Sequence, residues 1–143
     1  MNIYWLEAHE VEGVWHEIGP VFRRVVDKAV RGEFDVADIL DMAQEGKAKI
    51  GVIRDESGSV VMAVAFEFRH YPRKMGVNVF AMGGRRMADV MDQFLESFKE
   101  FCRVAGADWI ECSCSPAIAR MHHRIGYKTV YQNLRLDLQE VEK

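Results

Sequence analysis

Apolar residues alternate with polar ones at the start of the chain and then recur every three or four positions, which predicts a strand followed by a helix. Residues 2–8, with Ile3, Trp5 and Leu6, fit a strand at the edge of a sheet. A helical stripe follows, formed by Val14, Ile18, Val21, Val25 and Ala29. Pro20 interrupts the stripe, and because proline lacks the N–H that a helix interior uses, we expect a kink or a restart there.

A second helix and three strands are predicted in the middle of the chain. Asp35 is a suitable N-cap for a helix that ends at Gly46. The pattern then fits three strands, at 48–54, 60–69 and 74–82, separated by short turns. Strands joined by short turns pair with their neighbours in the sequence, so an antiparallel meander is predicted.

The second half of the chain fits a strand–helix–strand–helix–strand pattern. Its clearest helix has a broad apolar face, formed by Met87, Met91, Phe94, Phe98 and Phe101. A strand at 109–114 follows. Ser115 and Pro116 mark the next helix start, because serine caps helices and proline suits their first position. That helix ends at Gly126, and a last strand is expected at 127–138.

The composition is that of a folded protein and narrows the classes of function. The chain of 143 residues has 49% hydrophobic and 29% charged residues, so we expect one domain spanning residues 1–143. A formal net charge of −3 gives no basic footprint for nucleic acid. There is no run of 18 apolar residues and the first ten residues do not resemble a signal peptide, so we expect a cytoplasmic protein without a membrane partner.

Three cysteines are present, and two of them, Cys112 and Cys114, fall on one face of the strand predicted at 109–114. An odd number of cysteines without a second Cys pair favours reduced, buried thiols over a disulfide framework or a metal site. We therefore expect no bound metal.

The order of these elements and the run at residues 115–127 resemble the GNAT (Gcn5-related N-acetyltransferase) family. The run reads Ser-Pro-Ala-Ile-Ala-Arg-Met-His-His-Arg-Ile-Gly-Tyr. GNAT enzymes often carry Asn-x-x-Ala-x-x-Leu-Tyr-x-Lys-x-Gly-Phe between their last two inner strands. The basic residue, the glycine and the final aromatic match, whereas Ser115 and His122 replace the asparagine and the tyrosine. The resemblance implies an α/β fold with a mixed, mostly antiparallel sheet of six or seven strands flanked by about four helices.

The resemblance also implies a loop that binds the phosphates of acetyl-coenzyme A (acetyl-CoA) at a helix N-terminus, where unpaired amides and the helix dipole favour an anion. The family pattern is Arg/Gln-x-x-Gly-x-Gly/Ala. If Arg85 takes the arginine position of this pattern, its two glycine positions are occupied by Ala88 and Val90. Alternatively, Gly83 and Gly84 form a shorter loop, and Arg85 and Arg86 supply positive charge. We favour this second version, in which Asp89 opposes the phosphates.

The function that the resemblance implies is acyl transfer from acetyl-CoA to an unidentified amine, on a small molecule or a protein. Phe80, Ala81 and Met82 would pair with the pantetheine arm through their backbone, and Ser115 belongs to the expected cofactor-binding residues. His122, in the position of the family tyrosine, would protonate the departing thiolate, and only its imidazolium form could do so.

A general base would come from a titratable strand residue. The candidates are Glu67 and His70 on the long strand that is predicted to begin at Val60, and Glu111 on the strand after the clear helix. Either carboxylate could accept a proton from the attacking amine.

Two other interpretations stay open. The first is a non-catalytic GNAT-like structural or interaction protein, such as a phage virion component, with a degenerate CoA site. Small GNAT-like phage proteins with shortened phosphate loops resemble this chain. The second is a regulator that binds CoA without transfer. A homodimer and a virion partner are both consistent with the sequence, and a phage-encoded protein would lie in the host cytoplasm or in the virion.

Overall fold

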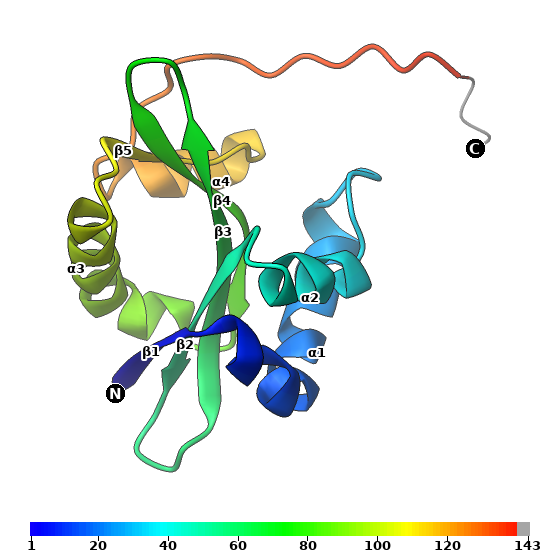
Figure 1. The fold of residues 1–143 in the computed structure, drawn as a ribbon. Helices are drawn as coiled ribbons and strands as arrows, with labels where there is room; N and C mark the ends of the chain where they lie inside the picture. The colour runs from blue at the N-terminus through cyan, green and yellow to red at the C-terminus, as the bar shows by residue number, and fades with distance from the viewer. Residues whose placement is uncertain (140–143) are drawn as a thin grey trace. The chain divides into compact units, whose positions relative to one another are not determined.

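Five strands form one sheet in the order β1-β2-β3-β4-β5 (Figure 1). The structure is a computed structural model that describes residues 1–139. The strands are β1 (Asn2–Leu6), β2 (Lys49–Arg54), β3 (Val60–His70), β4 (Met75–Gly84) and β5 (Trp109–Glu111). β1 to β4 pair antiparallel and β5 pairs parallel with β4. The predicted meander and the strand–helix–strand crossover are therefore confirmed.

Helices cover both faces of this sheet. Two of them, α1 (Val11–Ala29) and α2 (Val36–Gln44), pack on one face, and α3 (Met87–Val104) packs on the other (Figure 1). A short 3-10 helix at Ala8–Glu10 leads into α1. α1 continues through Pro20 as one helix, so the expected restart does not occur. Asp35 caps α2 as predicted, because its carboxylate accepts a hydrogen bond from the Val36 amide at 2.7 Å.

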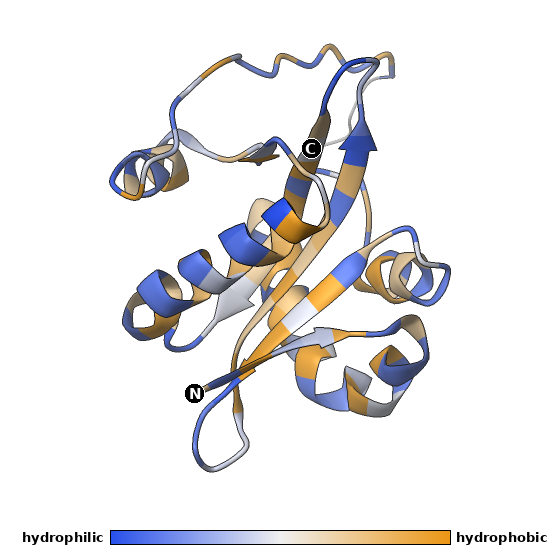
Figure 2. Cartoon of the chain, turned by 60° about the vertical axis from the view of Figure 1, so that its left-hand side comes forward, coloured by the Kyte–Doolittle hydropathy of each residue, from blue (hydrophilic) through white to orange (hydrophobic). Residues whose placement is uncertain are grey.

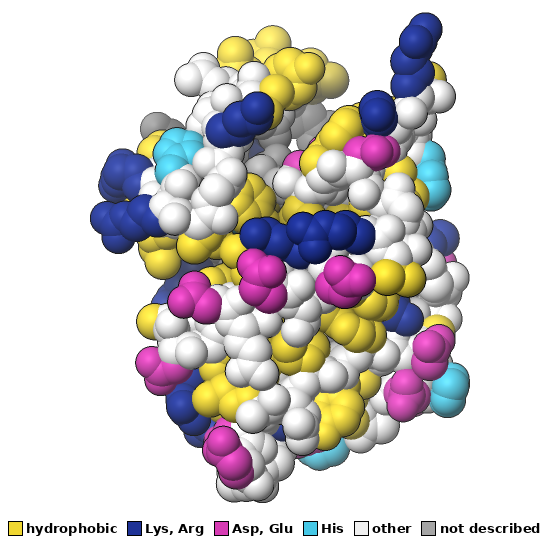
Figure 3. Space-filling view, turned by 90° about the vertical axis from the view of Figure 1, so that its left-hand side faces the viewer, with side chains coloured by type: hydrophobic (Ala, Val, Ile, Leu, Met, Phe, Trp, Pro, Cys, Tyr) yellow, Lys and Arg dark blue, Asp and Glu magenta, His cyan; other side chains and the backbone are white. Residues whose placement is uncertain are grey.

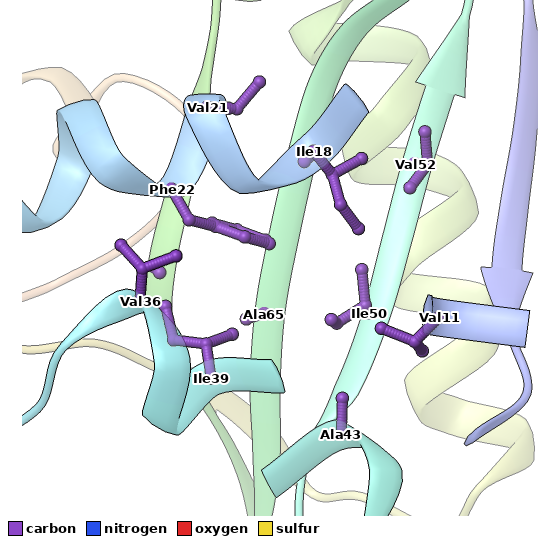
Figure 4. Close-up of a cluster of buried hydrophobic side chains, with 12 residues drawn as sticks. Val11, Ile18, Val21, Phe22, Val36, Ile39, Ala43, Ile50, Val52 and Ala65 are labelled. Atoms are coloured by element: carbon purple, nitrogen blue, oxygen red, sulfur yellow. The ribbon is translucent and has the colours of Figure 1, made fainter. Parts of the chain in front are cut away.

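The apolar stripes predicted from the sequence form two cores, one on each face of the sheet. On the first face, Ile18 and Phe22 of α1 and Ile39 of α2 pack over Ile50, Val52 and Ala65 of the sheet (Figure 4). On the second face, Phe94 and Phe98 of α3 pack over β3. Each helix turns its hydrophobic side to the sheet and its polar side outward (Figure 2).

Phe66 of β3 is the centre of an aromatic cluster in the second core. Its fully buried ring lies 5.0 Å from Phe98, 6.0 Å from Trp5 and 5.8 Å from Phe101, measured between centroids. These separations are typical of edge-to-face aromatic pairs. The cluster joins β1, the centre of the sheet and α3.

The chain divides into two compact units, which are Met1–Cys112 and the residues from Ser113 onward. In the second unit α4 (Pro116–His123) begins at the predicted cap, where the Ser115 hydroxyl accepts a hydrogen bond from the Ile118 amide. The helix is followed by Gly126, whose φ of +105° favours glycine.

The last strand, predicted at 127–138, is not formed, and this corrects the expected strand count from six or seven to five. A strand exists only where its backbone pairs with a neighbouring strand, and residues 127–139 are paired with none in the described part of the chain. β5 is also shorter than predicted and ends at Glu111. The mixed, mostly antiparallel sheet with four α-helices otherwise agrees with the predicted fold class. No helix among residues 1–139 is long and apolar enough to cross a membrane.

We expect Phe66→Ala to lower the free energy of unfolding by about 3–5 kcal/mol, because it removes a buried ring and leaves a cavity between β3 and α3. Urea unfolding followed by tryptophan fluorescence measures the change. Val104→Ala is the control, since Val104 is exposed at the end of α3 and its loss should change stability by no more than about 0.5 kcal/mol. Equal effects of the two substitutions would contradict this account of the core.

Candidate functional site

The two parallel strands β4 and β5 part soon after they begin. Only three residue pairs join them, and the last pair is Asn78 with Glu111. β5 ends there, whereas β4 continues through Val79–Gly84 with no strand on that side among residues 1–139. The edge of β4 beyond Asn78 therefore presents backbone N–H and C=O groups that an extended molecule could pair with.

A β-bulge lies within this free edge. Ala65 of β3 pairs with Ala81, and the next residue of β3, Phe66, pairs with Val79, so Phe80 is the extra residue. The Phe80 ring packs edge-to-face on Phe34, with the centroids 5.3 Å apart. The residues expected to meet a pantetheine arm thus lie on an irregular stretch of strand whose outer edge is open.

Gly83 and Gly84 belong to β4 and not to a loop, which corrects the shorter-loop prediction. Gly83 pairs with Ala63 and Gly84 with Met62. A Cβ on Gly84 would collide with the Val61 carbonyl oxygen, and a Cβ on Gly83 would lie 2.7 Å from a methyl group of Val25. Both glycines therefore permit close packing within the sheet and against α1.

The turn between β4 and α3 consists of Arg85 and Arg86. Arg86 occupies the N-cap position of α3, and no side chain caps the helix. The first amides of α3 are thus left without a capping acceptor, and the helix dipole adds positive potential. Two arginines beside an uncapped N-terminus form a place where an anion such as a diphosphate would be stabilised.

Carboxylates already lie beside both arginines. The Arg86 Nε atom is 3.3 Å from Asp89 in the first turn of α3, and Arg85 Nη2 is 3.9 Å from Asp55 in the turn between β2 and β3. A hydrogen bond from the Ser57 hydroxyl is the largest effect on Asp55 and lowers its pKa. Partial burial opposes this effect, and amide hydrogen bonds and the charge of Arg85 add to it. An incoming anion would therefore compete with carboxylates for both guanidinium groups.

A polar row crosses the sheet at the point where β4 and β5 part. Glu67 of β3 pairs in register with Asn78 of β4, which pairs in register with Glu111 of β5. Asn78 is only 6% exposed, and its amide donates to Glu67 Oε2 at 3.4 Å. The other oxygen of Glu67, Oε1, is 3.9 Å from Arg69 Nε. Glu67 thus keeps one carboxylate oxygen without a close donor among the described residues.

Glu111 is more firmly held than Glu67. Its Oε1 accepts hydrogen bonds from Tyr71 Oη at 2.9 Å and from Arg69 Nη1 at 3.1 Å, and its Oε2 accepts one from Trp109 Nε1. Partial burial is the largest single effect and raises the pKa of Glu111, but the three donors and the charge of Arg69 outweigh it and leave the pKa below its usual value. Of the two carboxylates among the predicted base candidates, Glu67 is the freer to take a proton.

His122 and Ser115 lie in the second unit, on α4. The His122 Nδ1 atom is 3.0 Å from the Ile118 carbonyl oxygen, and its ring packs edge-to-face on Tyr127 at 4.8 Å. Because a carbonyl oxygen only accepts, Nδ1 carries a proton and Nε2 of the neutral ring is an acceptor. His122 could therefore donate a proton from Nε2 only as an imidazolium ion.

The other candidate residues take no part in these clusters. His70 is exposed at the end of β3, and no metal-binding group of three or more His, Cys, Asp or Glu side chains occurs in residues 1–139. Cys102 is buried on the apolar face of α3, and burial raises the pKa of its thiol to about 12. Cys114, in contrast, is exposed.

Comparison with solved structures identifies the fold. No family model and no curated protein matches the chain. The crystal structure of ribosomal-protein-alanine N-acetyltransferase from Brucella melitensis biovar Abortus 2308 superposes with a TM-score of 0.72 at 12% identity, covering 96% of this chain and 100% of that chain. The chain has the fold of the GNAT superfamily.

Two further enzymes support the GNAT fold. Glucosamine-6-phosphate N-acetyltransferase from Arabidopsis thaliana has a TM-score of 0.64 at 14% identity, covering 96% of this chain and 98% of that chain. An acetyltransferase from Trypanosoma brucei has a TM-score of 0.64 at 15% identity, covering 96% of this chain and 99% of that chain. Such identities establish the fold alone, so the activity of this GNAT-fold chain has to be argued from its own residues.

Sequence reasoning found the two glutamates but missed the side chains that surround them. The sequence pattern predicts no functional role for Asn78, Arg69, Tyr71 or Trp109. Their assembly depends on the register of three strands, which no local pattern reveals. The one signal was Asn78 itself, a polar residue between the buried positions of a predicted strand.

We expect Glu111→Gln to lower the free energy of unfolding at pH 7 by about 1–2 kcal/mol, because charge-assisted hydrogen bonds are weakened. The folded-state pKa is below the unfolded value, so the contribution is present above about pH 4.3 and is lost as the pH falls through the folded-state pKa. The gap between wild type and variant should therefore shrink in acid.

Urea unfolding curves recorded at several pH values between 3 and 7 measure this gap. Glu56→Gln, an exposed change in the turn between β2 and β3, is the matched control and should leave stability nearly unchanged. A gap that stays constant down to pH 3 would argue against an ionised Glu111.

Proposed function

We propose that this chain is an N-acetyltransferase that moves an acetyl group from acetyl-CoA to an amine. The observation that carries the proposal is the free edge of β4 from Val79 to Gly84, which runs directly to two arginines and the uncapped start of α3. The pantetheine arm carries amide groups and can pair with a strand edge as another strand would. The diphosphate would then lie at the end of that edge.

The residues of the turn are suited to a diphosphate, but two neighbouring aspartates compete with it for the same arginines. Arg85 and Arg86 supply two guanidinium groups, and α3 supplies backbone amides. Asp55 and Asp89 would have to give up or share their arginines. The Arg86–Asp89 pair is largely exposed, and such pairs contribute little, about 0–1 kcal/mol. In the other pair Arg85 is exposed, whereas the Asp55 side chain is only 15% exposed and lies 3.9 Å away.

Glu67 is the residue we assign to proton removal from the acceptor. The amine nitrogen must lose a proton before it attacks the thioester carbonyl carbon; the new C–N bond then forms as the C–S bond breaks. Glu67 has an oxygen available for that proton, beside the point where β4 and β5 part. The departing sulfur takes a proton in turn, and the sequence run at 115–127 assigns that role to His122 as imidazolium.

A non-catalytic GNAT-fold protein is the second candidate function, and one observation favours it. Both arginines of the turn already have carboxylate partners, which is the arrangement expected where a phosphate site has degenerated. Binding of acetyl-CoA separates the two proposals, because a degenerate site would not bind it. A protein that binds acetyl-CoA but transfers nothing would instead fit a regulator.

We expect acetyl-CoA at about a hundred times its dissociation constant to raise the melting temperature by about 5–10 °C, because binding to the folded state adds about 2.7 kcal/mol. Differential scanning fluorimetry with millimolar acetyl-CoA measures the shift. The double variant Arg85→Glu/Arg86→Glu should lose most of it. Arg73→Glu, just before the opposite end of β4, makes the same kind of charge reversal at one exposed arginine and should keep it.

The absence of any shift in the wild type would refute the acetyl-CoA site and leave the non-catalytic interpretation. A shift that is equal in the Arg85→Glu/Arg86→Glu variant would show that acetyl-CoA binds elsewhere. Isothermal titration calorimetry on the same variants gives the stoichiometry.

We expect Glu67→Gln to reduce kcat at pH 7 by about 10²–10⁴-fold with acetyl-CoA affinity retained, since a general base contributes a factor of that size. Release of free thiol from acetyl-CoA reports turnover, with polyamines, aminoglycosides and peptides with free N-termini offered as acceptors. Glu111→Gln, on β5 at the other end of the same polar row, is the matched control and should keep kcat at temperatures where it stays folded. A larger loss in Glu111→Gln than in Glu67→Gln would reverse the assignment.

A further inference from the structure

The hairpin of β3 and β4 extends beyond the neighbouring strand β2, and part of β3 therefore has no partner on that side (Figure 1). The first residue of β2, Lys49, pairs with Phe66 of β3. β3 continues to His70, and no strand among residues 1–139 lies beside residues 67–70 on the β2 side. These four residues form the β3 edge, which is separate from the β4 edge assigned to the pantetheine arm.

The hydrogen bonds of the hairpin indicate which backbone groups of the β3 edge are free. The Tyr71 amide donates to the Lys74 carbonyl oxygen at 2.9 Å and closes the hairpin. In an antiparallel pair, residues that bond to the partner strand alternate with residues whose N–H and C=O groups point the other way. Counting back from Tyr71, the groups of His70 and Phe68 point away from β4, about 6.8 Å apart. An extended peptide has amides at the same interval and is the chemical partner of such an edge.

A cavity of about 180 Å³ lies beside the β3 edge, where β1 ends and β2 begins. The apolar part of its lining includes Leu6, Val11, Ala43, Ile50 and Phe68. The volume is below the roughly 300–1,000 Å³ of small-molecule sites, but an apolar cavity of about 150 Å³ can hold a benzene molecule. One aliphatic side chain therefore fits. Because Phe68 belongs both to the edge and to the lining, a strand added at the edge would bring a side chain to the cavity.

The charges that line the cavity are already balanced. Lys49 Nζ lies 3.8 Å from Glu7 Oε1, and Lys47 Nζ lies 2.8 Å from Glu45 Oε2. An anion would have to displace these carboxylates, whereas an apolar side chain would be buried without disturbing either pair. The outward face of α3, by comparison, mixes basic, acidic and apolar side chains as ordinary solvated surfaces do (Figure 3).

We propose that the β3 edge binds an extended peptide segment of a partner protein, which pairs with Phe68 and His70 as an added strand and inserts one aliphatic side chain into the cavity. The backbone hydrogen bonds would hold any extended chain, and the cavity would select the side chain. The β3 edge lies at the opposite end of the hairpin strands from Arg85 and Arg86, so the proposal does not depend on acetyl-CoA binding.

A peptide library tests whether the cavity selects a side chain. Its members are fluorescein-labelled heptapeptides Thr-Ser-Thr-Z-Thr-Ser-Thr without terminal charges, in which Z is varied and threonine favours an extended chain. Fluorescence polarisation with the full chain should show that peptides with Leu, Ile or Met at Z bind about 10-fold or more tightly than peptides with Ser or Asp. Equal affinities across the library, or no binding by any member, would overturn the proposal.

A proline substitution tests the strand pairing. The His70 amide points away from β4, so His70→Pro removes a donor to the peptide but no hydrogen bond of the β3–β4 pair. The variant should bind the tightest peptide about 3–10-fold more weakly, whereas His70→Ala keeps the amide and should bind as wild type. Urea unfolding checks that both variants are folded. N-methylation of alternate peptide amides tests the same bonds from the ligand, and unchanged binding of the N-methylated peptides would contradict the pairing.

Filling the cavity tests its role separately. Ala8 is exposed and lines the cavity, so Ala8→Trp should remove the preference for Leu at Z, whereas His9→Trp at the next position should keep it. Light scattering on the wild type tests the alternative occupant, which is a second copy of this chain. A mass of twice 16.4 kDa that falls to one chain in His70→Pro would identify that second copy as the partner and overturn the proposal.

Discussion

The placement of the candidate site depends on the short parallel contact between β4 and β5. The start of that contact is fixed, because the Asp108 amide donates to the Met75 carbonyl at 2.7 Å and the Met75 amide donates to the Asp108 carboxylate at 2.9 Å. Gly76 leaves room for the Trp109 ring, because a Cβ at position 76 would collide with the indole nitrogen. No corresponding hydrogen bonds join β4 and β5 beyond Asn78 in the described residues, because β5 ends at Glu111. Beyond Asn78, β4 is consequently an edge strand of the sheet, where a long substrate arm could be held by backbone groups alone.

The charges at the end of the β4 edge determine whether a substrate that carries a diphosphate can bind there. The arginines of the turn are paired with carboxylates at 3.3 and 3.9 Å, distances at which exposed ion pairs are weak. A diphosphate carries more charge than one carboxylate and can also accept from the amides of α3, so it is the stronger partner for the same guanidinium groups. Under the proposed function, the acidic neighbours would lower the affinity for the diphosphate, because it would have to displace them from the two arginines.

The parts of the fold that depend on local chemistry could be predicted from the sequence. The Asp35 and Ser115 caps, the stripe of α3 and the left-handed glycines at helix ends follow from spacing and residue type. Gly83 and Gly84 could not be placed, because they are required by contacts with Val25 and Val61, which are distant in the sequence. The strand predicted at 127–138 is not formed, because alternation alone does not specify the neighbouring strand with which its backbone would have to pair.

The distinction between an active and a degenerate GNAT fold rests on side chains rather than on the backbone. Both would retain the bulge at Phe80 and the open edge, because these follow from strand register.

The two glutamates at the point where β4 and β5 part differ in a way that function would explain. Glu111 has donors on both oxygens and so links β5 to the end of β3 and to the turn that follows it. Glu67 has one oxygen on Asn78 and one left open. A carboxylate that only supported the sheet would gain from a second donor, whereas a proton acceptor must keep a lone pair accessible. The arrangement around Glu67 is therefore the stronger argument for an enzyme.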